Sequence, residues 1–345
     1  MRYKLLGKSG LRVSQLCLGT MTFGETWGWG ASREESRAIF DAFVEAGGNF
    51  IDTANNYTDG CSETYVGECI ASERERFVVA TKYSLSTRKD DPNGGGNHRK
   101  NMTQALEASL KRLGTDYIDL YWLHMWDFMT PIDEVMRALD DMVRAGKVLY
   151  VGISDTPAWV VAQGNTMAEL RGWSRFVALQ LPYSIASRDP ERDLLPMAQS
   201  FDLAVLAWDV MDGGVLTGKY STDTPGTRRY DPNDVSERSV MLGRAVVQVA
   251  DEVGRSPAQV AINWVRQRQD RGLIIPIIGA RTAQQMRDNL AALEFELSPE
   301  HLRRLEEVSR PHIGFPQAFL NSDHVHGLIH GSTFELIDNH RAGRL

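Results

Sequence analysis

The sequence is poor in cysteine, has no long apolar run and carries no excess of basic residues. Its three cysteines, Cys17, Cys61 and Cys69, cannot form a fully paired disulfide framework, so we expect them to be reduced, buried side chains without a redox role. No window approaches about 18 uninterrupted apolar residues, and the N-terminus lacks the apolar core of a signal peptide. We therefore expect a cytoplasmic protein without a membrane span.

The charge balance argues against a polyanionic partner. Lys and Arg together number 38 and Asp and Glu number 45, so the net charge is −7, whereas nucleic-acid binding usually needs a basic face. A metal site is not expected either, because His324, His326 and His330 near the C-terminus have no accompanying cysteines or second ligand helix. We predict no nucleic acid, membrane or metal partner, and the sequence leaves the oligomeric state open.

Short apolar runs rich in β-branched residues recur along the chain and predict buried strands. There are eight of them: VSQLCLGT, NFIDTA, RFVVATKY, YIDLYWLH, LYVGIS, FVALQLPY, LAVLAWDV and LIIPIIGA. Helical patterns lie between most of them. One opens on Ser32 with Glu35 three residues later, as in a capping box, and another has Pro131 in its first turn. This alternation is typical of parallel βαβ units.

Eight regular units favour an α/β fold of the closed (β/α)8 type, a TIM barrel, over an open doubly wound sheet. No G-x-G-x-x-G motif follows the first strand, which weakens the doubly wound alternative. Residues 1–16 are expected to form a hairpin that turns at Lys8, Ser9 and Gly10 and plugs the barrel bottom. We predict one domain over residues 1–345, with extra C-terminal helices and a tail over 311–345.

The stretch AWDVMDGGVLTGKY, residues 207–220, nearly matches a P-loop. Gly213 is followed by four residues, Gly218 and Lys219, but Tyr220 stands where a P-loop has the serine or threonine that coordinates magnesium. The missing hydroxyl removes half of that mechanism. The pattern is compatible with a phosphate grip and argues against ATP hydrolysis.

In a barrel of this type the active site lies where the strands end, so polar residues at those ends are the candidates. They are Thr20, Asp52, Lys82, His124, Ser154, Gln180 and Trp208. Asp52, Lys82 and His124 follow neighbouring strands, and buried ionisable groups are costly unless they are paired. A structural ion pair beside a core histidine would account for any one of them. Their convergence, with Tyr57 just after Asp52, favours a functional site.

The motifs FIDTANNY, VVATKY, YIDLYWLH and VGIS, in this order and each at a strand end, resemble the aldo-keto reductase superfamily over about residues 5 to 309. The likeness is to long-chain bacterial members, and also to potassium-channel β-subunits. Members of the superfamily are (β/α)8 barrels that use NAD(P)H to reduce aldehydes and ketones to alcohols. The resemblance implies a catalytic tetrad of Asp52, Tyr57, Lys82 and His124.

The chemistry of carbonyl reduction suits these side chains. Negative charge grows on the carbonyl oxygen as hydride reaches the carbon, so the site needs a proton donor and positive charge. Tyr57 is expected to donate the proton, with its pKa lowered by the Lys82 ammonium, while Asp52 keeps that ammonium charged. His124 is expected to orient the carbonyl oxygen, in a protonation state that the sequence leaves open.

The resemblance also implies a dinucleotide site, with Trp208 against the nicotinamide ring and residues 209–219 around the pyrophosphate. The residues expected to contact the cofactor are Gly19, Thr20, Met21, Asp52, Ser154, Asp155, Gln180, Trp208, Asp209, Val210, Met211, Gly213, Lys219, Arg229, Gly279, Arg281, Gln285 and Asn289. Ser154 and Gln180 are expected at the carboxamide, and Gln285 and Asn289 at the adenine. Arg281 suits a 2′-phosphate, so we predict NADP(H), with NAD(H) as the alternative.

Two segments of this site depart from the family pattern. Asp209, Val210 and Met211 stand where the family often has Ser-Pro-Leu, and an acid beside phosphates is electrostatically awkward. Asp155 stands where asparagine is common, so a carboxylate replaces an amide. At these positions the phosphate loop and one carboxamide contact depart from the family pattern.

Large apolar residues follow several strand ends and predict an apolar or aromatic carbonyl substrate. Trp27, Tyr57, His124 and Trp126 are the expected substrate contacts, and Trp29, Phe128, Phe315 and Phe319 are further candidates for the rim.

Two other functions stay open. A dinucleotide-binding regulator with slow or no turnover would resemble the channel β-subunits, which depart from the reductase tetrad at the histidine, so His124 favours catalysis. A Schiff-base isomerase or aldolase would need a neutral Lys82 free of Asp52.

Overall fold

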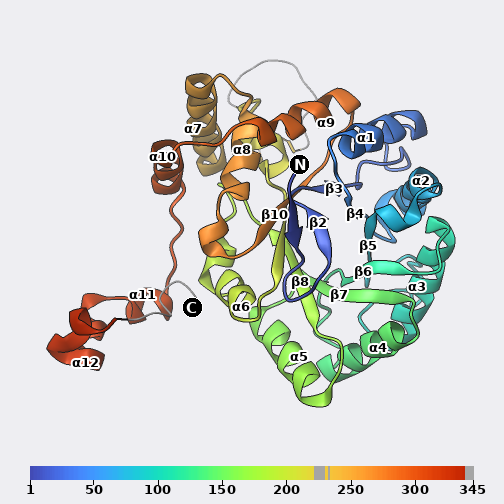
Figure 1. The fold of residues 1–345 in the computed structure, drawn as a ribbon, viewed down its shortest axis with the longest axis horizontal. Coiled ribbons are helices and arrows are strands. Elements are labelled where there is room, and N and C mark those ends of the chain that lie inside the picture. Colours follow the sequence, from blue (N-terminus) through green and yellow to red (C-terminus); the bar gives the residue numbers. More distant parts are fainter. Residues whose placement is uncertain (221–229, 232–233, 339–345) are drawn as a thin grey trace.

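The computed structural model describes residues 1–220, 230–231 and 234–338, and in it eight parallel strands close into a barrel in the order β10-β3-β4-β5-β6-β7-β8-β9 (Figure 1). The barrel strands are β3 (Cys17–Gly19), β4 (Phe50–Asp52), β5 (Val78–Tyr83), β6 (Ile118–Leu123), β7 (Val148–Ser154), β8 (Phe176–Pro182), β9 (Ala204–Trp208) and β10 (Ile274–Ile278). Every residue of β5 and β6 is buried, as expected of parallel strands covered on both faces. The predicted (β/α)8 barrel is confirmed.

Helices surround this barrel and follow the strands around the ring in Figure 1. They are α1 (Arg33–Glu45), α2 (Cys61–Ile70), α3 (Arg99–Leu113), α4 (Ile132–Arg144), α5 (Ala158–Arg171), α6 (Leu194–Ser200), α7 (Glu237–Val253), α8 (Pro257–Arg266), α9 (Ala283–Leu290) and α10 (Pro299–Ser309). Ser32 caps α1 by accepting from the Glu35 N–H, as the sequence predicts, but the capping box is not closed because the Glu35 carboxylate accepts from the Ala283 N–H instead. Pro131 is the N-cap of α4 and lies just outside its first turn, one position earlier than expected.

Two hydrophobic cores result, one between barrel and helices and one inside the barrel. The inner core consists of Leu6, Val13, Cys17, Phe50, Val78, Ala80, Leu120, Trp122, Ala178, Ala204, Leu206 and Ile275. Leu6 and Val13 come from the N-terminal segment, where the antiparallel strands β1 (Tyr3–Leu5) and β2 (Arg12–Ser14) form the expected hairpin. It lies over the barrel centre in Figure 1, so the predicted plug is confirmed.

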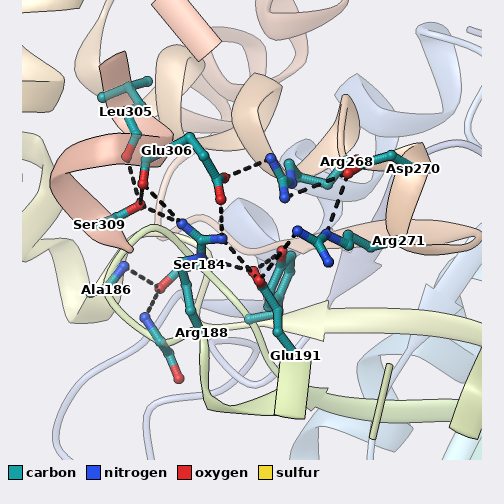
Figure 2. Close-up of polar contacts among 12 residues, drawn as sticks. Ser184, Ala186, Arg188, Glu191, Arg268, Asp270, Arg271, Leu305, Glu306 and Ser309 are labelled. Atoms are coloured by element: carbon teal, nitrogen blue, oxygen red, sulfur yellow. Dashed lines mark hydrogen bonds and ion pairs between the residues drawn. The ribbon is translucent and has the colours of Figure 1, made fainter. Parts of the chain in front are cut away.

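A buried ion-pair network ties α10 to the loop after β8 (Figure 2). Arg188 donates to both oxygens of Glu191, at 2.7 and 2.9 Å, and to Glu306 Oε1 at 2.5 Å. Arg268 donates to the other Glu306 oxygen at 2.7 Å, and Arg188 also reaches Ser309 Oγ at 2.9 Å. Since Arg188 and Glu191 are both almost fully buried, this network fixes the loop that follows Gln180 at the catalytic end of the barrel.

Beyond α10 the chain leaves the barrel through the short helices α11 (Gln317–Leu320) and α12 (Asp323–His330), which stand apart from it in Figure 1. His326 and His330 stack on Phe334, with ring centroids 4.3 and 5.1 Å apart. In the described part of the chain, no helix has the length and apolar character that crossing a membrane requires.

Candidate active site

The period of the strands explains why the candidate residues meet. Phe50, Val78, Leu120, Ala178 and Ala204 belong to the inner core, and alternate residues of a strand point to the same side. The polar candidates lie at even spacing after them. Asp52, Lys82, His124, Gln180 and Trp208 therefore all face the barrel interior at the carboxyl ends of their strands.

Lys82 lies at the centre of this group and is fully buried. Its ammonium forms an ion pair with Asp52 and donates to the Thr53 carbonyl at 2.8 Å and to Tyr57 Oη at 3.2 Å. Gln180 donates from Nε2 to the second Asp52 oxygen at 3.1 Å. The structure thus brings the predicted tetrad residues Asp52, Tyr57 and Lys82 into direct contact.

The environment keeps this pair ionised. Burial disfavours the charged form of Lys82, but Asp52 and Tyr57 together outweigh it and raise the pKa of Lys82 above its ordinary value, while burial also raises the pKa of Asp52. A Schiff-base role would require a neutral, unpaired lysine. The geometry therefore argues against the isomerase or aldolase alternative.

The predicted lowering of the Tyr57 pKa is wrong for the free chain. Burial raises the pKa of Tyr57, and the Lys82 ammonium only partly offsets this effect. Tyr57 is thus a neutral phenol at neutral pH. The sequence analysis considered the ammonium without the desolvation that comes with it.

His124 completes the group and is 7% exposed. Its ring lies edge-on to Tyr57, with centroids 5.9 Å apart. Burial, and then the charge of Lys82, lower the pKa of His124 well below its ordinary value, so the imidazole is neutral. Of the two protonation states that the sequence left open, this environment favours the neutral one.

Aromatic rings line the mouth beside Tyr57. Trp27 lies edge-on to Tyr57 at 6.5 Å and packs at 5.9 Å against Trp29. The Trp126 side chain is half-buried, and the Trp126 backbone N–H donates to the Asp155 carbonyl at 3.5 Å.

The more distant rim candidates are less enclosed. Phe128 is 72% exposed, and Phe315 and Phe319 lie on the C-terminal segment outside the barrel, 6.2 Å from each other. Phe315 instead lines a cavity of about 530 Å³ between that segment and the loop after β8.

Ser154, Asp155, Gln180 and Trp208 form the predicted nicotinamide end. Ser154 pairs in register with Gln180, and its buried hydroxyl has no partner of good hydrogen-bond geometry among the described residues. Asp155 has a left-handed backbone, with φ of 40°, and accepts from Trp208 Nε1 at 3.2 Å. Burial raises the pKa of Asp155 to about 6, while the Trp208 N–H and the Lys82 charge act in the opposite direction.

The predicted phosphate loop is a tight turn with a concave backbone. Gly213 and Gly214 have φ values of 58° and 89°, and a Cβ on Gly214 would lie 2.6 Å from Lys219 Nζ. Asp209 Oδ1 accepts from the Gly213 N–H at 2.7 Å, so this acid closes the turn. The residues that follow are partly structural, because Val210 is buried and the Met211 carbonyl accepts from the Gly214 N–H at 2.9 Å.

The predicted adenine end follows β10, the strand that pairs with β9. Asn289 donates to the Gly279 carbonyl at 3.1 Å, and Gln285 accepts from the Arg281 N–H at 2.9 Å. The Arg281 guanidinium forms no part of this bond. Gly279 lies against Gly19, whose carbonyl is 3.6 Å from where a Gly279 Cβ would stand.

The other cofactor candidates are placed as follows. Thr20 is buried and donates to the Asp52 carbonyl at 3.0 Å, and Met21 is half-buried beside it in the sequence. Arg229 lies outside the described residues.

The residues present fit a dinucleotide. A buried hydroxyl at Ser154 without a partner of good hydrogen-bond geometry, a half-buried Trp208 ring and a glycine turn beside Lys219 match an amide, a flat ring and phosphates respectively. The sequence analysis missed two links in this site, Gln180 to Asp52 and Asp155 to Trp208. The even spacing of Gln180 from Ala178 in β8 was a signal for the first of them.

Fold and site together define an oxidoreductase barrel with a buried Lys-Asp pair beside a tyrosine and a neutral histidine. The comparison with known families agrees, since the model of the Aldo/keto reductase family matches residues 15–310. The chain belongs to the Aldo/keto reductase family and is an oxidoreductase enzyme.

Its relatives include proteins named norsolorinic acid reductase and aryl-alcohol dehydrogenase. The chain is 41% identical to norsolorinic acid reductase stcV of Emericella nidulans, over 90% of this chain and 82% of that protein. It is 39% identical to norsolorinic acid reductase A of Aspergillus parasiticus, over 92% of this chain and 84% of that protein. It is 36% identical to aryl-alcohol dehydrogenase [NADP(+)] of Phanerodontia chrysosporium, over 93% of this chain and 89% of that protein.

Proposed function

We propose that this enzyme interconverts an aromatic aldehyde or ketone and its alcohol, with NADP(H) as the cofactor and Tyr57 as the proton donor. The observation that carries the proposal is the 3.2 Å contact between Lys82 Nζ and Tyr57 Oη, backed by the buried ion pair of Lys82 with Asp52. It joins a phenolic proton donor to a fixed positive charge, which carbonyl reduction requires.

The bound cofactor would supply or accept the hydride at the carbonyl carbon. Tyr57 donates its phenolic proton to the carbonyl oxygen as negative charge develops there, and takes a proton back in the reverse direction. Lys82 stabilises the resulting phenolate and offsets part of the cost of burying that charge. Solvent returns the proton to Tyr57 after the alcohol leaves.

The two remaining members of the tetrad hold this arrangement. Asp52 keeps the Lys82 ammonium charged, and Gln180 fixes the Asp52 carboxylate from the other side. His124, as a neutral imidazole, can donate one hydrogen bond to the carbonyl oxygen without competing for the proton of Tyr57. The reacting carbon is thereby held above Tyr57 and His124.

NADP(H) is favoured over NAD(H) by Arg281 and by a relative whose name states NADP(+). The cofactor would be held by the residues named above: Ser154, Gln180 and Trp208 for the nicotinamide, Gly213 and Lys219 for the pyrophosphate, and Arg281, Gln285 and Asn289 for the adenosine end.

An aromatic substrate is favoured by the rings of Trp27 and Trp126 at the mouth, and by relatives named for aryl alcohols and norsolorinic acid. A cytoplasmic location and a single domain over residues 1–345 stay predictions of the sequence.

The test combines binding and turnover in one sample. Titration with NADPH should quench tryptophan fluorescence, because Trp208 would lie against the nicotinamide, and adding 4-nitrobenzaldehyde should then consume NADPH at 340 nm. Tyr57→Phe should lower kcat by at least about a hundredfold and leave the NADPH Kd unchanged. Quenching without turnover in the unmodified protein would favour the regulatory alternative, and an equal loss of binding and turnover in the variant would remove Tyr57 from the donor role.

A further inference from the structure

Asp155 is held in place by backbone bonds on both sides. Its N–H donates to the Gln180 carbonyl at 3.1 Å, and its carbonyl accepts from the Trp126 N–H at 3.5 Å. The left-handed φ of 40° turns the side chain toward β9, where the carboxylate accepts from Trp208 Nε1 at 3.2 Å. Both the position of the carboxylate and its direction are thus determined by the fold.

A hydrogen bond from Trp208 and a poorer one from Ser154 hold this carboxylate, but no cation among the described residues forms an ion pair with it. From β5, Lys82 also faces it, but that ammonium is paired with Asp52 of β4. Tyr57 and His124 are neutral, and Asp209, next to Trp208, turns its carboxylate to the Gly213 N–H. The nicotinamide end of the site therefore carries one surplus negative charge, located on Asp155.

We propose that the Asp155 carboxylate makes the site prefer the oxidised cofactor, whose nicotinamide ring is a cation, over the reduced cofactor, whose ring is neutral. The inference rests on the proposed function, since it needs Trp208 to lie against the nicotinamide. A carboxylate attracts a cationic ring through the half-buried indole and gains nothing from a neutral one. Asp155 is here a positioning and specificity residue, and takes no part in the transfer of the proton.

The charge matters for the direction of the reaction. Tighter binding of NADP⁺ than of NADPH shifts the equilibrium between the bound reactants toward NADP⁺ and the alcohol, and leaves the equilibrium in solution unchanged. The amide expected at this position from the family pattern would hold the same indole N–H without this bias. The departure at position 155 thus favours the oxidised cofactor and the alcohol on the enzyme.

Asp155→Asn is the decisive variant, because an amide oxygen can still accept from Trp208 Nε1. We expect the ratio Kd(NADP⁺)/Kd(NADPH) to rise about tenfold at pH 8, measured by calorimetry without substrate, while Trp208 fluorescence remains quenchable. Asp155→Ala should change the ratio equally and also weaken both cofactors, because the indole loses its acceptor. Asp116→Asn, at an exposed position before β6, should leave the ratio unchanged.

The pH gives a second readout that needs no substitution. With a pKa of about 6, Asp155 is largely protonated at pH 5.5, so the ratio in the unmodified protein should rise about threefold between pH 8 and pH 5.5. The Asn variant should show no such change. The 2′-phosphate titrates in both forms of the cofactor, so its effect cancels in the ratio.

The outcomes separate this inference from the proposed function. Failure of the unmodified protein to bind either cofactor would overturn both. Binding with a ratio that Asp155→Asn leaves unchanged, or equal weakening of both forms, would overturn the preference and leave the reductase intact. A tenfold change in the ratio together with the loss of its pH dependence would establish it.

Discussion

Replacing Lys82 by Met should destabilise the protein and abolish activity, and a second substitution, at Asp52, separates the two effects. Lys82 is fully buried, and the Asp52 side chain is 3% exposed, so the substitution leaves a carboxylate without its counter-ion in the barrel interior. Breaking a buried pair in this way costs about 3–5 kcal/mol, because the remaining charge is uncompensated. We expect the free energy of unfolding in urea at pH 7 to fall by that amount.

The double variant Asp52→Asn, Lys82→Met is the control. An asparagine oxygen can still accept from Gln180, and no charge remains buried, so the double variant should be more stable than Lys82→Met alone by at least about 2 kcal/mol. Activity should be absent from both. Additive losses of stability would show that Lys82 and Asp52 do not form the coupled pair described here, and measurable turnover of either variant would remove Lys82 from the proton-transfer scheme.

Three further predictions test other parts of the molecule. Arg281→Ala should weaken the binding of NADPH at least about tenfold more than the binding of NADH in fluorescence titrations, because a charge-assisted bond to the 2′-phosphate is lost. Equal weakening of both would show that Arg281 does not determine the cofactor preference. Trp126→Ala should raise KM for an aromatic aldehyde about tenfold relative to a small aliphatic one at unchanged cofactor Kd, and an unaltered profile would make this ring a packing residue. Arg188→Met should lower the free energy of unfolding by about 3–5 kcal/mol, because the Glu191 carboxylate stays buried without its counter-ion. The control Arg303→Met, at a side chain that is 60% exposed, should lower it by under about 1 kcal/mol. Similar values for the two variants would contradict the role given to the network in Figure 2.

The barrel and the grouping of the candidate residues follow from short-range patterns in the sequence. A strand that is buried on both faces reads as a continuous apolar run, so all eight could be found before their pairing was known. A period of two then places Lys82 inside because Ala80 and Val78 are inside. Ser32 likewise predicts the start of α1, because its side chain accepts a hydrogen bond from a backbone N–H only three positions away.

Other features depend on contacts that no local pattern contains. The bond between Arg188 and Glu306 joins residues 118 positions apart, and it exists because α10 packs beside the loop after β8. The sign of the pKa shift at Tyr57 depends on how strongly burial competes with one ammonium, which requires coordinates. The direction of the Asp155 side chain depends on a left-handed backbone that is uncommon for a residue other than glycine.

The two acids flanking Trp208 show why charge alone is a poor guide to such a site. Asp209 and Asp155 both looked unfavourable in the sequence, one beside phosphates and the other in place of an amide. The Asp209 carboxylate accepts from the Gly213 N–H within the turn that forms the predicted phosphate loop, so this acid shapes the loop. Asp155 accepts from the edge of the Trp208 indole, and its charge acts on whatever lies against that ring. The same side chain is therefore structural at one position and selective at the other, because the first carboxylate closes the turn that carries it and the second faces the ring on which the cofactor would lie.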